Sequence, residues 1–525
     1  MISFKTIHWG AYALLTATLA ATSLLFDETL FKSAWLISLW ALSAVLLTIV
    51  ILRRRMWRRV GSFLMHMSFI IMLSGALTTM ISGKRGSIDI IPGTATNEYV
   101  DEESYVQMLP FTIELDSIIR NFHPDGLTPS SYECILTIDG TKHTLSNNGI
   151  IEHNGYIFSQ KLIDDHSDTA IIGVNHDKAG TMLFFSGAIL FVIASVWIMI
   201  SKMARRKVPT VAAIILLSIS TLQANASTMP IETTNALSSN ELSVGQSASS
   251  SNDIAIGPVR YTSAIKAAYD GMNFHAAFFI MAFAIGLLSL RQAIVNRKIS
   301  KWLIRLSWVA IAFQLTGYVL RWMIYGHIPF ATTSDTMTLL SAATAALTII
   351  MARRSDELTF ALGMTASGII GLIASLSQSV PEASHLPVAL ASPWLAIHVS
   401  LVMMSYTLFV FAFIISMAGL TNRRQAPRLA ETLKTVLLPA VLLLGMGILT
   451  GSAWALSAWG RYWGWDPKET WALITFMTYA VPLHGSIRWF DNPRHLFAYN
   501  SLAIITVIMT YIGVNYMPSL HSYGG

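Results

Sequence analysis

Residues 395–418 read LAIHVSLVMMSYTLFVFAFIISMA, an apolar run that holds one histidine and no charged side chain. A helix of this length rises about 36 Å, enough to cross the roughly 30 Å of hydrocarbon in a bilayer. The whole chain of 525 residues has the same character, with 53% hydrophobic residues, 12% charged residues and a mean hydropathy of +0.54. Soluble domains carry about 25% charged residues. We therefore expect a polytopic α-helical membrane protein.

Hydropathy predicts about thirteen transmembrane helices. They lie roughly at 9–26, 34–52, 61–82, 181–200, 208–226, 272–291, 302–322, 334–351, 358–378, 395–418, 435–455, 468–487 and 498–517. Basic residues cluster in every second connection between these spans. The clusters lie at Arg53–Arg59, Lys202–Lys207, Arg291–Lys301, Arg353–Arg354, Arg423–Arg428 and Arg488–Arg494. The positive-inside rule then predicts a cytoplasmic N-terminus and an external C-terminus.

Residues 84–178 interrupt the helical pattern with a polar segment. Apolar and polar residues alternate over 111–115 and 156–158, which is typical of half-buried β-strands. Three dipeptides are favoured hairpin turns, namely Asp139-Gly140, Asn148-Gly149 and Asn154-Gly155. The sequence therefore predicts a small extracytoplasmic β-rich domain between two spans.

Residues 208–226 allow two interpretations. Lys207 precedes a short apolar run that ends in Ala224-Asn-Ala226, as a signal peptide with its cleavage site does. The same run also fits an ordinary, slightly short span. Residues 227–262 are rich in Ser, Thr and Asn and read as a linker. We accordingly divide the chain into residues 1–205, 206–270 and 271–525.

Cys134 is the single cysteine of the chain. It excludes an internal disulfide, a CxxC redox pair and a cysteine-based metal site within this chain, so any thiol chemistry must come from a partner or substrate. The net charge is +6, but the basic residues gather in short loops. Such loops orient a protein in a membrane, so we expect lipid as a partner and no nucleic acid.

Residues 459–471 read WGRYWGWDPKETW. Asp466, Pro467 and Glu469 form a helix start, with Asp as N-cap and Glu closing a capping box, and capping alone can account for both carboxylates. The tryptophans could belong to an aromatic belt at the membrane interface. A belt is spread around a protein, however, whereas this cluster occupies one loop. A flat apolar platform for a large planar ligand is the alternative. The tryptophans of the loop 454–471 are Trp454, Trp459, Trp463, Trp465 and Trp471.

The stretch WGRYWGWDPKETWALI resembles the tryptophan-rich WWD signature of the haem-handling proteins of cytochrome c maturation. Residues 270–525 are similar to the CcsA (ResC) part of the system II cytochrome c synthases, through Gly326–Pro329, LPVALASPWLAIH at 386–398 and the final segment 513–523. Residues 1–205 resemble the CcsB (ResB) part more weakly, through Gly61–Ile71 and the β domain between two spans. The chain thus resembles synthases in which the two parts are fused, with a shorter β domain than in many relatives.

A histidine inside a predicted span is costly and usually functional, and two such histidines are predicted toward the cytoplasmic face. His66 lies one to two turns into the third span. His484 lies about 17 residues along the helix predicted from Pro467, roughly 25 Å from the outer surface. Both are therefore predicted near the cytoplasmic face at the same depth. A pair at one depth could ligate one iron, and the alternative is two unrelated interfacial histidines.

Two further histidines are predicted near the outer face, and they flank the tryptophan loop in the predicted topology. His398 lies about one turn below the outer end of its span, and His521 lies four residues beyond the last span. By motif they match the two external haem-ligand histidines of the family, as His66 and His484 match its membrane pair. His385 is the main rival of His398, but it lacks the Trp-x-x-x-His context.

The positions and the resemblance together imply a route for haem b, bound as substrate through histidine pairs. The cofactor-binding residues would be Trp454, Trp459, Trp463, Trp465, Asp466, Trp471, His66 and His484, and the catalytic pair His398 and His521. Haem b would pass from the inner pair to the outer pair, where the CxxCH cysteines of an apocytochrome c form thioether bonds with it. A thioredoxin-like reductase would keep those cysteines reduced. The resemblance implies a bacterial inner membrane location, with the loop and the C-terminus external.

Two other functions fit part of the pattern. A haem exporter or delivery subunit would share the tryptophan signature, but such relatives lack the CcsB-like half that carries His66. A b-type electron-transfer cytochrome would also use paired histidines. Such a cytochrome has no use for an external tryptophan loop flanked by histidines, so we expect a holocytochrome c synthase.

Overall fold

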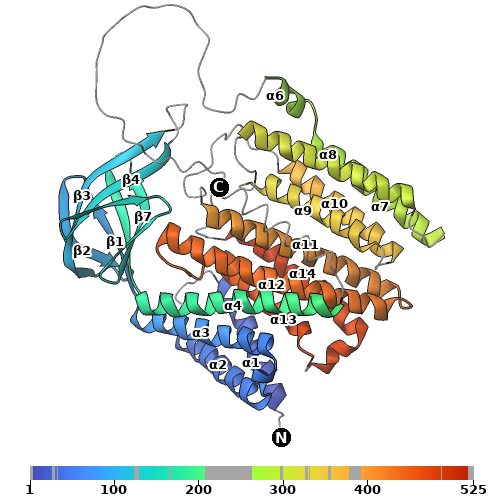
Figure 1. Ribbon diagram of the computed structural model, residues 1–525, viewed down its shortest axis with the longest axis horizontal. Coiled ribbons are helices and arrows are strands. Elements are labelled where there is room, and N and C mark those ends of the chain that lie inside the picture. The colour runs from blue at the N-terminus through green and yellow to red at the C-terminus, as the bar shows by residue number, and fades with distance from the viewer. Residues whose placement is uncertain are drawn as a thin grey trace, which may run out of the picture.

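The computed structural model describes residues 4–25, 30–31, 33–122, 129–164, 167–206, 263–295, 300–325, 329, 332–352, 356–377, 392–485 and 487–517. Figure 1 shows a β domain at one end of a body of long helices. The predicted span 208–226, the predicted linker and the histidines His385 and His521 lie outside the described residues. The division of the chain at residues 205 and 271 therefore stays a prediction.

The N-terminal half contributes four helices that lie along one side of the body (Figure 1). They are α1 (Phe4–Leu24), α2 (Ala34–Arg53), α3 (Val60–Ser82) and α4 (Lys178–Arg206), with the short 3-10 helix η2 (Met56–Arg58) between α2 and α3. Helices α3 and α4 pack with their backbones in close approach. A Cβ on Gly75 would lie 2.5 Å from the Phe184 nitrogen, and one on Gly187 would lie 2.8 Å from the Met72 nitrogen. Only glycine permits this contact, so α3 and α4 behave as one unit.

The β domain is an eight-stranded antiparallel sheet in the order β5-β4-β3-β2-β1-β8-β7-β6. Its strands are β1 (Lys84–Ile90), β2 (Thr94–Asp101), β3 (Val106–Phe122), β4 (Pro129–Ile138), β5 (Thr141–Ser146), β6 (Ile150–His153), β7 (Tyr156–Asp164) and β8 (Thr169–His176). The edge strands β5 and β6 touch, so the sheet curls toward a barrel. One residue joins α3 to β1, and one residue, Asp177, joins β8 to α4.

The predicted strand pattern is confirmed in this domain. Every second residue of β3 is buried from Leu109 to Leu115, which gives the barrel its apolar core. Asp139-Gly140 and Asn154-Gly155 both have positive φ at the two central positions, as type I′ hairpin turns require. They connect β4 to β5 and β6 to β7.

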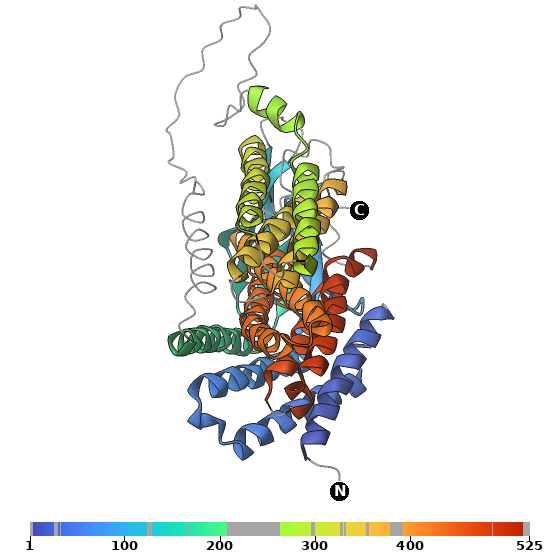
Figure 2. The ribbon, with the colours of Figure 1, turned by 90° about the vertical axis from the view of Figure 1, so that its right-hand side faces the viewer.

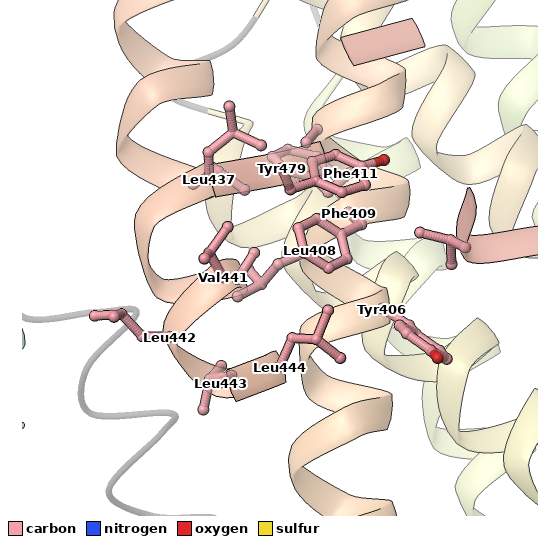
Figure 3. Packing of buried hydrophobic residues seen from close by; sticks show 14 of the residues in the cluster. Tyr406, Leu408, Phe409, Phe411, Leu437, Val441, Leu442, Leu443, Leu444 and Tyr479 are labelled. Atoms are coloured by element: carbon pink, nitrogen blue, oxygen red, sulfur yellow. The ribbon is translucent and has the colours of Figure 1, made fainter. Parts of the chain in front are cut away.

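The C-terminal half forms two further layers of helices. The helices are α6 (Ser263–Asp270), α7 (Phe274–Val295), α8 (Lys301–Tyr325), α9 (Thr333–Met351), α10 (Glu357–Leu376), α11 (Pro393–Thr421), α12 (Ala426–Trp459), α13 (Pro467–Ala480) and α14 (Pro493–Tyr511), with the 3-10 helices η4 (Val481–Leu483), η5 (Arg488–Asp491) and η6 (Gly513–Tyr516). Helices α11 to α14 lie between α1–α4 and the outer group α7–α10 (Figure 2). The largest core lies in this middle layer, where Phe409 of α11 stacks on Tyr479 of α13 at 3.9 Å between ring centroids and packs beside leucines of α12 (Figure 3).

Nine helices of the described residues are long and apolar enough to cross a membrane, so the chain is a multi-pass membrane protein. They are α2, α3, α4 and α7 to α12. Three other predicted spans are occupied by the helices α1, α13 and α14, which do not reach the same length and hydropathy, and the span 208–226 lies outside the described residues. The number thirteen is therefore not confirmed.

The predicted continuous helix 468–487 is wrong. Helix α13 ends at Ala480, and a 3-10 turn, η4, follows before the chain reaches His484. Pro482 is the physical reason, because proline lacks the N–H that would bond residue 478 and its ring would clash with that carbonyl. The helix and the turn together measure about 27 Å, close to the roughly 25 Å expected between Pro467 and His484.

Candidate functional site

A cavity of about 2170 Å³ separates the helices of the N-terminal half from α12 and α13. Ligand pockets usually measure about 300–1,000 Å³, so this cavity exceeds the size of a single pocket. On α3 its lining runs from Ser62 to Met80, nineteen residues, which corresponds to about 27 Å along the helix. The cavity therefore extends over most of the thickness of a membrane, between the two halves of the chain.

His66 and His484 lie together at one end of this cavity, which we call the histidine end. Their ring centroids are 6.1 Å apart, and the ring planes are inclined by 86°. His66 donates from Nδ1 to the Ser62 carbonyl at 2.7 Å, and His484 donates from Nδ1 to the Ala480 carbonyl at 2.8 Å. A carbonyl only accepts, so the proton of each ring is on Nδ1 and the lone pair is on Nε2. This is the tautomer in which Nε2 can bind a metal.

Helix α1 adds two residues that sequence reasoning left out. The Trp9 ring meets the His484 ring edge-on at 5.2 Å between centroids, and His8 lines the cavity with a buried Nδ1 that has no hydrogen-bond partner among the described residues. The signal was present, because His8 and Trp9 lie at the inner end of the first predicted span, on the predicted side of His66.

The tryptophan loop connects α12 to α13 at the other end of the cavity, the tryptophan end. Gly460 ends α12 in the left-handed conformation with φ 68°. Asp466 accepts from the Lys468 nitrogen at 2.9 Å, and Glu469 accepts from the nitrogens of Asp466 and Gly464 at 3.2 Å and 2.8 Å. The predicted helix start at Pro467 and its capping box are confirmed. The carboxylates of Asp466 and Glu469 therefore both accept hydrogen bonds at the start of α13.

The tryptophans of the segment 459–471 do not form the single flat platform that was the alternative to an aromatic belt. Trp463 and Trp465 line the cavity and stand at 88° to each other. Trp454 and Trp459 form a separate pair, 4.9 Å apart and inclined by 63°, beside Leu395 of α11. Trp471 is buried against α1 and α2. The physical reason is that α12, the loop and α13 point their side chains to different sides.

His398 lies on α11 near the Trp454–Trp459 pair and is not among the residues that line the cavity. It donates from Nδ1 to the Gly447 carbonyl at 2.7 Å, so its lone pair is also on Nε2. His521 lies outside the described residues, and its pairing with His398 stays a prediction. Within the described part of the chain, no group of three or more His, Cys, Asp or Glu side chains is placed to hold a metal ion.

The N-terminal half holds the tryptophan loop through a set of contacts that we call the clasp. The Tyr462 and Thr79 hydroxyls are 2.6 Å apart, and Thr79 donates to buried Asp177 at 2.6 Å. The Tyr462 ring stacks on Phe184 at 4.2 Å between centroids. Burial raises the pKa of Tyr462 to about 12, so its hydroxyl stays protonated and can donate at neutral pH.

A second arm of the clasp comes from the β domain. Asn175 of β8 donates to the Gly460 carbonyl at 2.7 Å and is buried there. The loop is thus fixed on one side by α3 and α4 and on the other side by the sheet. Both halves of the chain therefore contact the loop that carries Trp463 and Trp465.

Two family comparisons bear on this arrangement. Residues 274–521 match the family of the cytochrome C assembly protein, and residues 43–205 match the ResB-like family. A CcsA cytochrome c biogenesis protein from Synechococcus sp. strain WH7803 is 32% identical over 272 residues, which cover 84% of that protein and 42% of this chain. The chain belongs to the fused ResB–CcsA family of system II cytochrome c synthases.

Other relatives of this ResB–CcsA protein agree. The CcsA protein of Synechococcus sp. strain CC9311 is 32% identical over 294 residues, which cover 96% of that protein and 47% of this chain. Protein NrfI of Wolinella succinogenes is 32% identical over 231 residues, 42% of this chain but only 26% of NrfI. The predicted resemblance is confirmed, and the ResB–CcsA protein acts in cytochrome c maturation and haem handling.

Proposed function

We propose that the protein moves haem b from an inner site at His66 and His484 to an outer site at His398 and His521, and there attaches it to an apocytochrome c. The observation that carries this proposal is the cavity, which continues from the histidine pair to Trp463 and Trp465. It lies between the two halves that the family comparisons identify. We assign the histidine end to the cytoplasmic side of the bacterial inner membrane.

The geometry of the inner pair supports ligation of one iron. Two imidazoles on opposite sides of a metal, each with a bond of about 2.0 Å and a ring centre about 1.2 Å behind the nitrogen, have centroids about 6.4 Å apart. The rings of His66 and His484 are 6.1 Å apart. Their Nδ1 hydrogen bonds hold both rings in the tautomer that ligation needs.

The outer site is supported by the surroundings of His398. The ring has the same tautomer, fixed by the Gly447 carbonyl, and the Trp454–Trp459 pair lies next to its helix. Indoles offer apolar faces and edges that suit a porphyrin. His521 follows the last described helix closely in the sequence and would supply the second ligand.

The attachment step adds an S–H bond of the substrate across a haem vinyl group. The sulfur forms a C–S bond, the hydrogen goes to the other vinyl carbon, and no oxidant is consumed. The nucleophile is a CxxCH cysteine of the apocytochrome, kept reduced by a thioredoxin-like protein. The synthase supplies axial ligation, orientation of the vinyl groups and proximity.

The absorption spectrum of the purified full-length chain tests this function. We expect the low-spin spectrum of bis-histidine haem b, which changes in His398→Ala. His66→Gly and His484→Gly should lose inner haem and regain it with added imidazole, whereas His143→Gly in the β domain should match the parent. A colourless protein, after control for haem lost to detergent, would refute haem binding.

A second measurement distinguishes a synthase from a haem delivery subunit. Co-expression with an apocytochrome c should yield cytochrome whose haem stays attached on a denaturing gel. Haem binding without this covalent product would leave the protein as an exporter. Bound haem that is reversibly oxidised and reduced, but is neither moved to the outer site nor attached to the apocytochrome, would indicate a b-type electron-transfer cytochrome.

A further inference from the structure

Five arginines surround the mouth of the cavity at the histidine end. They are Arg53, Arg54, Arg55, Arg58 and Arg59, in the connection between α2 and α3, and all five line the cavity. Their side chains are exposed, as expected of guanidinium groups that stay hydrated at a mouth. We call this set the arginine rim.

Most of the charge of the rim has no acidic partner in the described part of the chain. Among the described residues, Arg54, Arg55, Arg58 and Arg59 form no ion pair. The carboxylates among the described lining residues are Asp101, Glu102 and Glu103, all in the β domain at the tryptophan end. The tryptophan end also holds Lys84 and Arg85, so its charges nearly cancel, whereas the charged side chains of the rim are all positive.

The rim lies within reach of the inner histidines. Arg59 directly precedes α3, and His66 lies seven residues further, about 10 Å along the helix. Arg55 has a left-handed φ of 47°, which turns the chain back into η2. An arginine side chain and a haem propionate are together long enough to bridge the distance between the rim and His66. The haem iron can then lie between the imidazole rings of His66 and His484.

We propose that the arginine rim binds the two propionate carboxylates of haem as it enters the inner site. Guanidinium groups form paired, charge-assisted hydrogen bonds with carboxylates, because their planar fork matches the two carboxylate oxygens. Haem then enters with its propionates on the rim and its apolar edge toward the interior of the cavity. The inference rests on the proposed function and adds an orientation to it.

Membrane topology alone does not account for the rim. Basic loops are expected at the cytoplasmic face, and the connection between α11 and α12 carries Arg423 and Arg424 for that reason. Neither of these residues lines the cavity. They therefore offer a matched control with the same charge and the same predicted side of the membrane.

The test compares haem with its dimethyl ester, in which both propionates are blocked. Full-length protein in the His398→Ala background isolates the inner site, and binding is followed by the bis-histidine spectrum. We expect the ester to bind roughly tenfold or more weakly than haem. The double variant Arg54→Gln/Arg58→Gln should bind haem as weakly as the ester, and Arg54→Lys/Arg58→Lys should recover part of the loss. Arg423→Gln/Arg424→Gln should behave like the parent.

The outcomes separate the two proposals. Equal affinity of the parent for haem and ester, with binding still lost in His66→Ala, overturns the rim and leaves the inner site intact. Binding that survives both His66→Ala and His484→Ala overturns the inner site itself. If the Arg54→Gln/Arg58→Gln defect appears only in nanodiscs with anionic lipid, the rim binds lipid headgroups and the proposal is wrong.

Discussion

Asp466 and Trp465 show how one short stretch serves two purposes. Trp465 has a left-handed φ of 58°, unusual for a bulky residue, and its indole stacks on Phe31 at 4.9 Å between centroids. Asp466 follows at once and caps α13. The hydrogen bond from the Lys468 nitrogen to Asp466 fixes the backbone directly after Trp465. We therefore expect this cap to help orient the Trp465 indole, which lines the cavity.

Substitution of Asp466 separates capping from ligand binding. Asp466→Ala should lower the free energy of unfolding by about 1 kcal/mol, because the Lys468 nitrogen loses its acceptor. Asp466→Asn should keep the cap and most of the stability. Thermal unfolding of both variants in detergent checks this, with the haem spectrum recorded in parallel.

The haem spectra of the Asp466 variants show whether the carboxylate also contributes to haem binding. If Asp466→Asn unfolds like the parent but loses haem, the carboxylate has a role beyond capping. Unchanged stability of Asp466→Ala would contradict the capping role, which the buried side chain and the reciprocal Glu469 contacts favour.

At the scale of single residues, the sequence indicated how far along a helix a side chain lies better than it indicated which way the side chain points. The common depth of His66 and His484 followed from their positions along predicted helices, and the structure brings the two rings together. The separation of the indoles could not be predicted, because it depends on how α12 and α13 are rotated against their neighbours. The break at Pro482 was readable, since proline rarely continues a helix.

The clasp belongs to the scale of elements, because it joins a loop of one half to a helix and a sheet of the other. Tyr462→Phe keeps the ring stack on Phe184 and removes the hydroxyl that meets Thr79. We expect a loss of about 1 kcal/mol in stability and a lower yield of attached haem, since the loop is held less firmly. Gel detection of covalent haem measures the yield.

Two comparisons sharpen the clasp experiment. Asp177→Asn should give a similar phenotype, since it weakens the acceptor of the Thr79 hydroxyl. Tyr516→Phe is a fitting control, because Tyr516 lies in η6 and is 85% exposed. A normal yield in Tyr462→Phe would show that the loop is positioned without the clasp.

Cys134 gives a prediction for the β domain. The thiol is fully buried between strands, and burial raises its pKa to about 11. At pH 8 the folded protein should therefore react with a maleimide far more slowly than the denatured chain, whose cysteine has a pKa of about 8.5. The rate should rise as pH approaches 11, and rapid labelling of folded protein at pH 8 would contradict the barrel core.

Elements were predicted unevenly from the sequence. The hairpins at Asp139-Gly140 and Asn154-Gly155 follow from residues that tolerate positive φ, so they were predictable locally. Closure of the sheet depends on contact between β5 and β6 through the whole curvature of the barrel. Helix α13 has only 14 residues, and α1 and α14 are less apolar than the nine helices that qualify as spans, which is why the span count differs.

For the molecule as a whole, the cavity between the halves suggests a blocking experiment. Ala76 lines the cavity on α3 between the histidine end and the tryptophan end. Ala76→Trp should fill that passage, so haem should stay at the inner pair and covalent attachment should fall. A barrier higher by about 1.4 kcal/mol already slows transfer tenfold.

The control for this experiment lies on the same helix. Thr78 donates to the Ser74 carbonyl and does not line the cavity, so Thr78→Trp should leave transfer nearly unchanged. Normal attachment in Ala76→Trp would mean that haem reaches the outer site by another path. No hydropathy pattern predicts this cavity, because its walls are joined from segments hundreds of residues apart.

The single-residue connections on both sides of the β domain have a mechanical consequence. Helices α3 and α4 are locked together at Gly75 and Gly187, and the barrel continues them without a flexible linker. The barrel and the helix pair therefore form a lever arm. A tilt of about 5° imposed on the barrel would move His66 by about 2 Å over the roughly 27 Å length of the cavity. A force on the barrel from outside would therefore change the distance between His66 on α3 and His484 in the other half of the chain.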